Sequence, residues 1–220
     1  MAYIDFLDET HRSTKRDYLA RVLAGNKADF AATAKRFGFD YWDGSRNTGY
    51  GGYSYDGRWL KVAKRIAGHY GLRAGDRVLD VGCGKGFLLY ELTNALPGVS
   101  IAGIDVSRYA IDNAKEEVRP FLQEGNAVKL PYPDKSFELV VSINTLHNLQ
   151  LPELELALKE IERVAIRSKY IVVDGYRTEE EKVNLLYWQL TCECFFTPEE
   201  WEWVFRKCGY TGDYGCVYFD

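Results

Sequence analysis

Beyond residue 75, short runs of β-branched residues alternate along the chain with stretches that have helical periodicity. Such alternation is typical of parallel strands joined by helical crossovers, and therefore of a mostly parallel sheet with helices on both faces. The predicted strands are Arg77–Val81, Ser100–Val106, Phe121–Glu124, Phe137–Ile143 and Lys169–Val173. The predicted helices between them are Phe87–Leu96, Tyr109–Val118 and Pro152–Val164. The predicted fold class is α/β.

A glycine-rich turn, DVGCGKG, joins the first predicted strand to the helix that begins at Phe87. Open parallel sheets bind ligands beyond the carboxyl ends of their strands, near the point where the strand order reverses. Gly82 and Gly84 allow a tight turn and the close approach of a ligand, although a tight turn alone would also use them. Asp105, at the end of the second strand, can accept hydrogen bonds from both hydroxyls of a ribose or can cap the helix that follows.

The spacing of the glycines favours one class of nucleoside ligand over another. Dinucleotide sites use G-x-G-x-x-G, whereas this turn has the spacing G-x-G-x-G with Asp80 just ahead of it. A carboxylate at that place suits an ammonium group better than a pyrophosphate. The residues alone therefore predict a ligand that carries ribose, adenine and an amino acid.

Three stretches together resemble the successive motifs of class I S-adenosylmethionine-dependent methyltransferases: VLDVGCGKGFLLYEL, IAGIDVSRYAIDNA and GNAVKLPYPDKSFELVVSINTLHNL. They are most similar to the subgroup that acts on small metabolites such as quinones and sugars. The resemblance covers roughly residues 57–210. It implies a Rossmann-like fold, S-adenosylmethionine as cofactor with S-adenosylhomocysteine as product, and an enzyme that methylates O or N of a small-molecule acceptor by in-line displacement.

The same resemblance implies which residues bind the cofactor. Asp80 and the turn after it would contact the methionine part, Asp105 would hold the ribose, and Val106 would pack on the adenine. Asn126 stands where the family usually has Asp, and its carbonyl oxygen can accept the same bond from the adenine amino group. The residues expected to bind the cofactor are Asp80, Gly82, Cys83, Gly84, Asp105, Val106, Asn126, Ala127, Asn144 and Tyr50.

His147 and Asn144 are the expected catalytic residues. Asn144 ends the fourth predicted strand and would line the mouth to which the methyl group points. His147 follows three residues later, and its ordinary pKa near 6.5 suits proton removal from an acceptor hydroxyl or ammonium. A loop histidine that packs on Leu146 or caps a helix is the alternative. No metal is expected, although His147, Asp174 and Glu193 would be the residues to converge on one.

Residues 46–59, RNTGYGGYSYDGRW, combine hinge-forming glycines with four aromatic residues. We expect this segment to close as a lid over the cofactor and acceptor, and alanine at Tyr50 or Tyr53 to lower turnover with little loss of melting temperature. A loop packed permanently on the domain is the alternative. Arg46 and Arg58 suit an acceptor with a carboxylate or phosphate. The residues expected to bind the acceptor are Tyr53, Tyr55, Arg46, Asn148, Tyr187, Trp188 and Glu193.

The chain divides into an N-terminal helical extension with the lid, 1–56, and a cofactor-binding domain, 57–220. Helices are predicted from Thr10 to Ala24 and from Asn26 to Phe37, and they would complete the lid or form the interface of a homodimer. Thr178 and Thr197 are predicted N-caps, each followed three residues later by Glu. Only about one strand follows the last helix, so the seven-stranded sheet of the family is expected to be trimmed.

Charge and composition exclude several classes of protein. The net charge is −4 and no basic run resembles a nucleic-acid footprint, so no nucleic-acid partner is expected. Five cysteines without C-x-x-C spacing predict neither a disulfide framework nor a zinc site. With no signal-peptide pattern and no apolar run of about 18 residues, we expect a cytoplasmic protein without a membrane span. The alternatives in function are an NAD(P)-dependent oxidoreductase, which the glycine spacing disfavours, and a non-catalytic cofactor-binding module.

Overall fold

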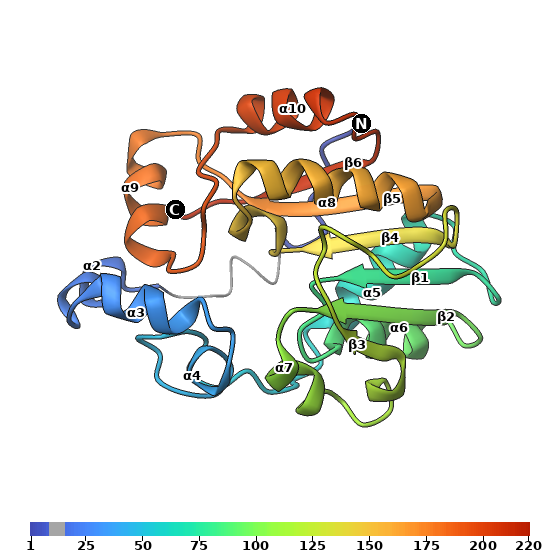
Figure 1. Ribbon diagram of the computed structural model, residues 1–220, viewed down its shortest axis with the longest axis horizontal. Helices are drawn as coiled ribbons and strands as arrows, with labels where there is room; N and C mark the ends of the chain where they lie inside the picture. Colours follow the sequence, from blue (N-terminus) through green and yellow to red (C-terminus); the bar gives the residue numbers. More distant parts are fainter. Residues whose placement is uncertain (9–15) are drawn as a thin grey trace.

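The computed structural model describes residues 1–8 and 16–220, and a six-stranded sheet forms its centre (Figure 1). All paired strands are parallel, in the order β3-β2-β1-β4-β5-β6. The strands are β1 (Arg77–Val81), β2 (Ser100–Asp105), β3 (Leu122–Glu124), β4 (Phe137–Ile143), β5 (Ala165–Asp174) and β6 (Asp213–Val217). The predicted α/β, Rossmann-like fold is confirmed. The strand order reverses between β1 and β4, so the turn after β1 lies where ligands of such sheets bind.

Helices cover both faces of the sheet, because successive residues of each strand point to opposite sides. Leu139 of β4 packs in one apolar cluster with α5 (Trp59–His69) and α6 (Phe87–Ala95). Val140 packs in the opposite cluster with α8 (Leu151–Val164) and α10 (Pro198–Lys207). These two layers hold the carboxyl ends of the strands in fixed positions.

The helix after β2 is shorter than predicted. It was expected over Tyr109–Val118, whereas α7 spans Arg108–Asp112. The backbone N–H of Lys115 donates to the carbonyl of Lys85 at 3.1 Å, outside the helix, so the helical ladder is interrupted there. A 3-10 helix, η1 (Arg119–Phe121), then leads into β3.

Several helices of the described chain lie beyond the carboxyl ends of the strands (Figure 1). They are α2 (Tyr18–Leu23), α3 (Lys27–Ala34), α4 (Phe39–Trp42) and α9 (Glu179–Trp188). Asn26 caps α3 as predicted, but this helix ends three residues before Phe37, which has a φ of 48°. The start of the helix predicted from Thr10 lies outside the described residues. Within the described residues, no helix is long and apolar enough to cross a membrane.

The two ends of the chain meet at the edge of the sheet. A single strand, β6, follows α10 and pairs with β5. The sheet of the described chain therefore has six strands, in agreement with the expectation of fewer than seven. The backbone N–H of Ile4 donates to the carbonyl of Tyr214 at 2.8 Å, and Phe6 is buried in the core below. The first residues therefore pack with the main sheet, which the sequence did not indicate.

The two predicted threonine caps both form. Thr178 accepts from the backbone N–H of Glu181, and Thr197 forms a full capping box with Glu200. In α9, which is apolar on two sides, Leu185 is buried while Tyr187 faces outward and is 38% exposed. One side of α9 therefore packs on the core and the other faces solvent.

Candidate active site

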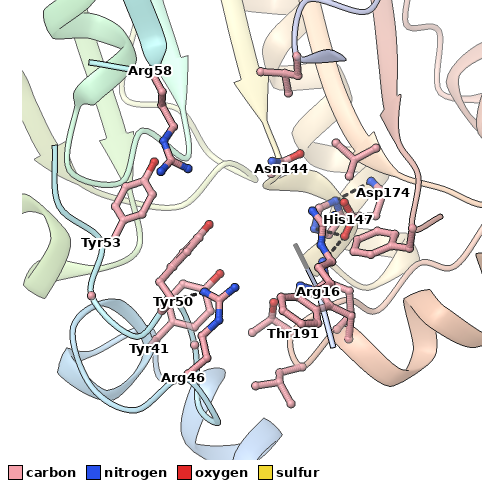
Figure 2. A pocket seen from close by; sticks show the side chains of 18 of the residues that line it. Arg16, Tyr41, Arg46, Tyr50, Tyr53, Arg58, Asn144, His147, Asp174 and Thr191 are labelled. Atoms are coloured by element: carbon pink, nitrogen blue, oxygen red, sulfur yellow. Dashed lines mark hydrogen bonds and ion pairs between the residues drawn. The ribbon is translucent and has the colours of Figure 1, made fainter. Parts of the chain in front are cut away.

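Two neighbouring cavities open beyond the carboxyl ends of the strands. The first, here called the glycine-loop cavity, has a volume of about 450 Å³ and is lined by the turn after β1 and the ends of β2 and β4. The second, here called the arginine cavity, has a volume of about 480 Å³ and is lined by Arg21 and by Arg16, Arg46 and Arg58, of which the last three are labelled in Figure 2. The residues that line both cavities are Tyr41, Tyr50, Tyr53, Trp59, Phe87 and Asn144.

The turn after β1 is held in place by Asp105. One carboxylate oxygen accepts the backbone N–H of Gly84 at 2.8 Å, and the other accepts that of Ser107 at 2.8 Å. The N-cap of α7 is Ser107, so the alternative role of Asp105 as a helix cap is wrong. Gly82 has a φ of 84°, and a Cβ there would lie 2.0 Å from the hydroxyl of Thr145. Only glycine allows this approach of the loop after β4 to the turn.

Asp80 is the second acid of the glycine-loop cavity, and it is 4% exposed. Burial and the nearby charge of Asp105 raise the pKa of Asp80 to about 8. Among the described residues, no side chain forms a hydrogen bond or ion pair with its carboxylate. Two buried acids without a cation between them favour a positively charged ligand. The residues therefore fit the amino-acid end of S-adenosylmethionine.

All ten residues expected to bind the cofactor line the glycine-loop cavity. Val106 is 48% exposed at its rim, where an adenine would cover it. The Oδ1 of Asn126 accepts the backbone N–H of Val128 at 3.1 Å, and a carbonyl oxygen has a second lone pair for an adenine amino group. The contacts of these residues with a bound cofactor stay a prediction.

The N-terminal extension is fastened to the glycine turn by contacts that the sequence did not indicate. Trp42 lies over Gly84 and donates its indole N–H to the hydroxyl of Ser107 at 2.9 Å. Asp43 forms an ion pair with Lys85 at 2.7 Å and accepts the hydroxyl of Tyr109 at 2.8 Å. No local sequence pattern marks these contacts, because they join residues far apart in the chain.

The aromatic segment 46–59 packs over both cavities. Tyr50 stacks on Trp42 with ring centroids 5.4 Å apart, and Tyr53 stacks on Phe87 at 5.0 Å. A Cβ at Gly49 would lie 1.9 Å from the carbonyl oxygen of Tyr41, so this glycine serves a close contact rather than a hinge. The segment covers the cavities as the lid hypothesis expects, and its movement stays a prediction.

His147 and Asp174 form a buried pair in the wall of the arginine cavity (Figure 2). His147 lies in a 3-10 helix, η2 (Leu146–Asn148), and both side chains are 2% exposed. The Nδ1 of His147 accepts the backbone N–H of Asp174 at 3.0 Å, and its Nε2 lies 3.4 Å from Oδ2 of Asp174. Burial lowers the pKa of His147 and raises the pKa of Asp174. The imidazole is therefore neutral, with its proton on Nε2 toward the carboxylate.

Comparison with known proteins identifies the domain. Residues 79–173 match the family described as a methyltransferase domain. These residues hold the glycine turn, Asp105 and Asn144. The domain belongs to the class I S-adenosylmethionine-dependent methyltransferases. S-adenosylmethionine is the methyl donor of this family, as the sequence predicts.

Among curated relatives of this methyltransferase domain, 27-O-demethylrifamycin SV methyltransferase from Amycolatopsis mediterranei (strain S699) is 34% identical over 96 residues. That match covers 40% of this chain and 35% of the relative. Demethylmenaquinone methyltransferase from Staphylococcus aureus (strain Newman) is 36% identical over 106 residues, which cover 46% of this chain and 43% of the relative. The chain thus spans less than half the length of either relative.

A solved structure has a similar fold over most of this chain. It is a complex from Haloferax volcanii between the Trm112 methyltransferase activator and a methyltransferase. The identity is 21% and the TM-score 0.58, over 89% of this chain and 77% of the other. At this identity the likeness concerns the fold alone.

The geometry of the His147–Asp174 pair changes the catalytic roles expected from the sequence. His147 was expected to be the general base, but both of its ring nitrogens face Asp174. The hydrogen bond from Gln189 also goes to Oδ2 of Asp174. Among the described residues, Oδ1 of Asp174 accepts no hydrogen bond and forms no ion pair. Asp174 is therefore the better candidate to accept a proton. Asp174 is the last residue of the buried strand β5, and its position at the end of an apolar run is the sequence signal that could have indicated this role.

Three expected acceptor residues lie away from the arginine cavity, and those expectations are corrected. Tyr55 donates its hydroxyl to Glu91 and packs against Phe87 from outside. Tyr187 is on the solvent side of α9, and Glu193 pairs with Lys35. None of the three is among the described residues that line either cavity.

The remaining expected acceptor residues do reach a cavity. Arg46 and Trp188 line the arginine cavity, Tyr53 lines both cavities, and Asn148 lines the glycine-loop cavity instead. Since the carboxylate of Glu193 pairs with Lys35, the three side chains considered for a metal do not converge. No group of three or more metal-binding side chains occurs in the part of the chain that the structure describes.

Proposed function

We propose that this chain transfers a methyl group from S-adenosylmethionine to an oxygen or nitrogen of a small-molecule acceptor that lies in the arginine cavity. One observation carries the proposal: the two cavities share a wall made by Asn144, Tyr50 and Tyr53. A ligand in the glycine-loop cavity is thereby adjacent to a ligand in the arginine cavity. Alignment of two reactants in contact is the main requirement of an in-line displacement.

The residues of the glycine-loop cavity bind and orient the cofactor in this proposal. Asp80 attracts the ammonium group, Asp105 accepts from the ribose hydroxyls, and Asn126 accepts from the adenine amino group. S-adenosylmethionine, when bound, supplies a methyl group on a sulfonium, so its C–S bond breaks as a bond to the acceptor forms. Asn144, which has a φ of 54° at the end of β4, lies at the boundary where the two reactants meet.

The His147–Asp174 pair removes the proton that a hydroxyl or ammonium acceptor must lose. The proton passes to Oδ1 of Asp174, whose raised pKa makes it a stronger base than an exposed carboxylate. His147 keeps the carboxylate in place through the hydrogen bond at Nδ1 and the contact at Nε2. The aromatic segment excludes water from the shared wall.

The relatives support a small-molecule acceptor, since one is named for methylation at the 27-O of demethylrifamycin SV. The buried acids of the glycine-loop cavity disfavour the pyrophosphate of NAD(P), in agreement with the glycine spacing. A cytoplasmic location, a homodimer and the absence of nucleic-acid partners stay predictions.

The test combines binding with turnover. Isothermal titration should detect binding of S-adenosylmethionine, and S-adenosylhomocysteine should accumulate when small hydroxylated or amino acceptors are added. A protein that binds the cofactor but gives no S-adenosylhomocysteine with any acceptor would support the non-catalytic alternative. NAD(P) should leave the melting temperature unchanged.

A further inference from the structure

Three guanidinium groups surround one indole ring in the arginine cavity. The guanidinium carbon of Arg21 lies 4.7 Å from the ring centroid of Trp188, that of Arg46 at 5.1 Å and that of Arg16 at 5.6 Å. Arg21 and Arg46 come from the N-terminal extension, and Trp188 is the last residue of α9. All four residues of this cluster line the arginine cavity.

The backbone fixes Arg21 and Arg46 but does not neutralise them. Arg21 donates from Nε to the carbonyl of Trp188 at 2.8 Å and from Nη1 to that of Arg46 at 2.6 Å. Arg46 donates from Nη1 to the carbonyl of Tyr50 at 2.6 Å. Among the described residues, neither arginine forms an ion pair with a carboxylate. Nη2 of Arg21 and both Nε and Nη2 of Arg46 therefore remain available as donors.

Among the described residues, the two acids of the same cavity form no ion pair with Arg21 or Arg46. Asp56 pairs with Arg58 through a 2.6 Å hydrogen bond, and Asp174 is held by His147 and Gln189. Burial and the charge of Arg46 lower the pKa of Arg21 to about 10. The positive charges of Arg21 and Arg46 are therefore held close together, which costs free energy. An anion bound between them would offset this cost.

We propose that the arginine cavity selects acceptors that carry an anionic group, a carboxylate or a phosphate, and that Arg21 and Arg46 bind this group beside Trp188. This inference rests on the proposed function, because it names the substrate class of the same cavity. Trp188, Leu190 and Phe219 add apolar surface to the lining, so the anionic group is attached to an apolar or aromatic body. The hydroxyl or amine that is methylated then lies toward Asp174 and Asn144.

The test uses the whole chain saturated with S-adenosylhomocysteine, so that only the arginine cavity is open to a probe. Benzoate, phenyl phosphate and uncharged benzyl alcohol are titrated by ligand-observed NMR and calorimetry. We expect at least one anion to bind about tenfold or more tightly than benzyl alcohol, because charge-assisted hydrogen bonds are strong. The two anions separate a carboxylate site from a phosphate site.

Two variants locate the site. R21Q and R46Q should each weaken binding of the preferred anion about tenfold and leave benzyl alcohol unaffected. R108Q is the matched control, since it removes a charge from an exposed arginine outside both cavities. It should bind the anion as the wild type does.

Equal binding of benzyl alcohol and both anions to the wild type would overturn the inference, and this comparison needs no variant. Equal anion affinity in R21Q, R46Q and the wild type would also overturn it. Failure of the proposed function has a different signature, because S-adenosylhomocysteine would then not accumulate from S-adenosylmethionine with any acceptor, whether or not the anions bind. Retained binding of S-adenosylhomocysteine shows that a variant is folded.

Discussion

The two cavities of this chain are built in different ways. The glycine-loop cavity is formed by the turns that follow β1, β2 and β4 and by part of the N-terminal extension, and its buried charged groups are the acids Asp80 and Asp105. Lys35, Arg36 and Glu153 also line it, at exposed positions. The arginine cavity is formed largely by the N-terminal extension and the region of α9, and most of its charged groups are arginines. Most residues that line the first cavity lie within the segment that matches the family, whereas most residues that line the second lie outside it. In the proposed function, the donor half therefore lies mostly in the segment that matches the family, and the acceptor half lies mostly outside that segment.

This difference predicts that a substitution in the glycine-loop cavity affects mainly the cofactor, and that a substitution in the arginine cavity affects mainly the acceptor. The largest effect is expected in the acceptor half, for D174N. Loss of the general base should lower kcat about a thousandfold and leave the affinity for S-adenosylhomocysteine within about twofold of the wild type. Steady-state kinetics and calorimetry on the same preparation measure both.

The pH profile sharpens this prediction. Wild-type kcat should increase with pH as Asp174 loses its proton, through a pKa above the ordinary value of an aspartate. D174N should lack that limb of the profile. A variant with normal kcat would show that the acceptor needs no base from Asp174.

In the donor half, D105A should show the second largest effect. The carboxylate holds the N–H of Gly84 and is expected to accept from the ribose, so its loss should weaken cofactor binding about a hundredfold. E116A removes an exposed acid and is the control. Titration with S-adenosylmethionine measures both variants, and unchanged affinity in D105A would remove the assigned ribose contact.

Y53L tests the boundary between the cavities. Tyr53 lines both, so its replacement should lower kcat/KM for cofactor and acceptor alike, by about tenfold each. Because the ring stacks on Phe87, a fall in melting temperature should accompany the loss, whereas the sequence analysis predicted little loss of melting temperature. A fall in kcat/KM for only one of the two ligands would contradict the proposal that Tyr53 belongs to a wall shared by both cavities.

The smallest expected effect concerns stability without a ligand. The folded chain keeps a proton on Asp80 up to about pH 8, whereas an unfolded aspartate releases it near pH 4. This contribution to the free energy of unfolding is therefore complete below pH 4 and lost as the pH rises to about 8. D80N cannot titrate, so its stability relative to the wild type should increase between pH 5 and pH 8.

Urea unfolding at several pH values measures this difference, with E116Q as the control. A stability difference between D80N and the wild type that does not change with pH would show that Asp80 titrates normally. Saturating S-adenosylhomocysteine should reduce the pH dependence of the wild type, since an ammonium beside Asp80 favours the carboxylate.

The same division explains how much the sequence could predict. The bounds of β1 and β4 agree with the prediction, and the residues of the glycine turn lie at a cavity, because these signals lie within a few residues of one another. The acceptor half depends on contacts such as that between Arg21 and Trp188, which are 167 positions apart. A single sequence has no local pattern for such a contact.

The predicted roles were wrong for residues whose role depends on the direction in which the side chain points. Tyr187 and Trp188 are neighbours on α9, yet only Trp188 faces the arginine cavity. His147 was placed in the correct loop, but its pairing with Asp174 depends on where β5 ends beside η2. Helical and strand periodicity predict which faces are apolar, and they do not predict which polar groups meet across elements.

A crystal structure of the chain with S-adenosylhomocysteine tests the central claim most directly. The account predicts the amino group beside Asp80, the ribose on Asp105, and the sulfur facing the arginine cavity at Asn144. Density for the ligand in another place, or a sulfur directed away from the shared wall, would contradict it.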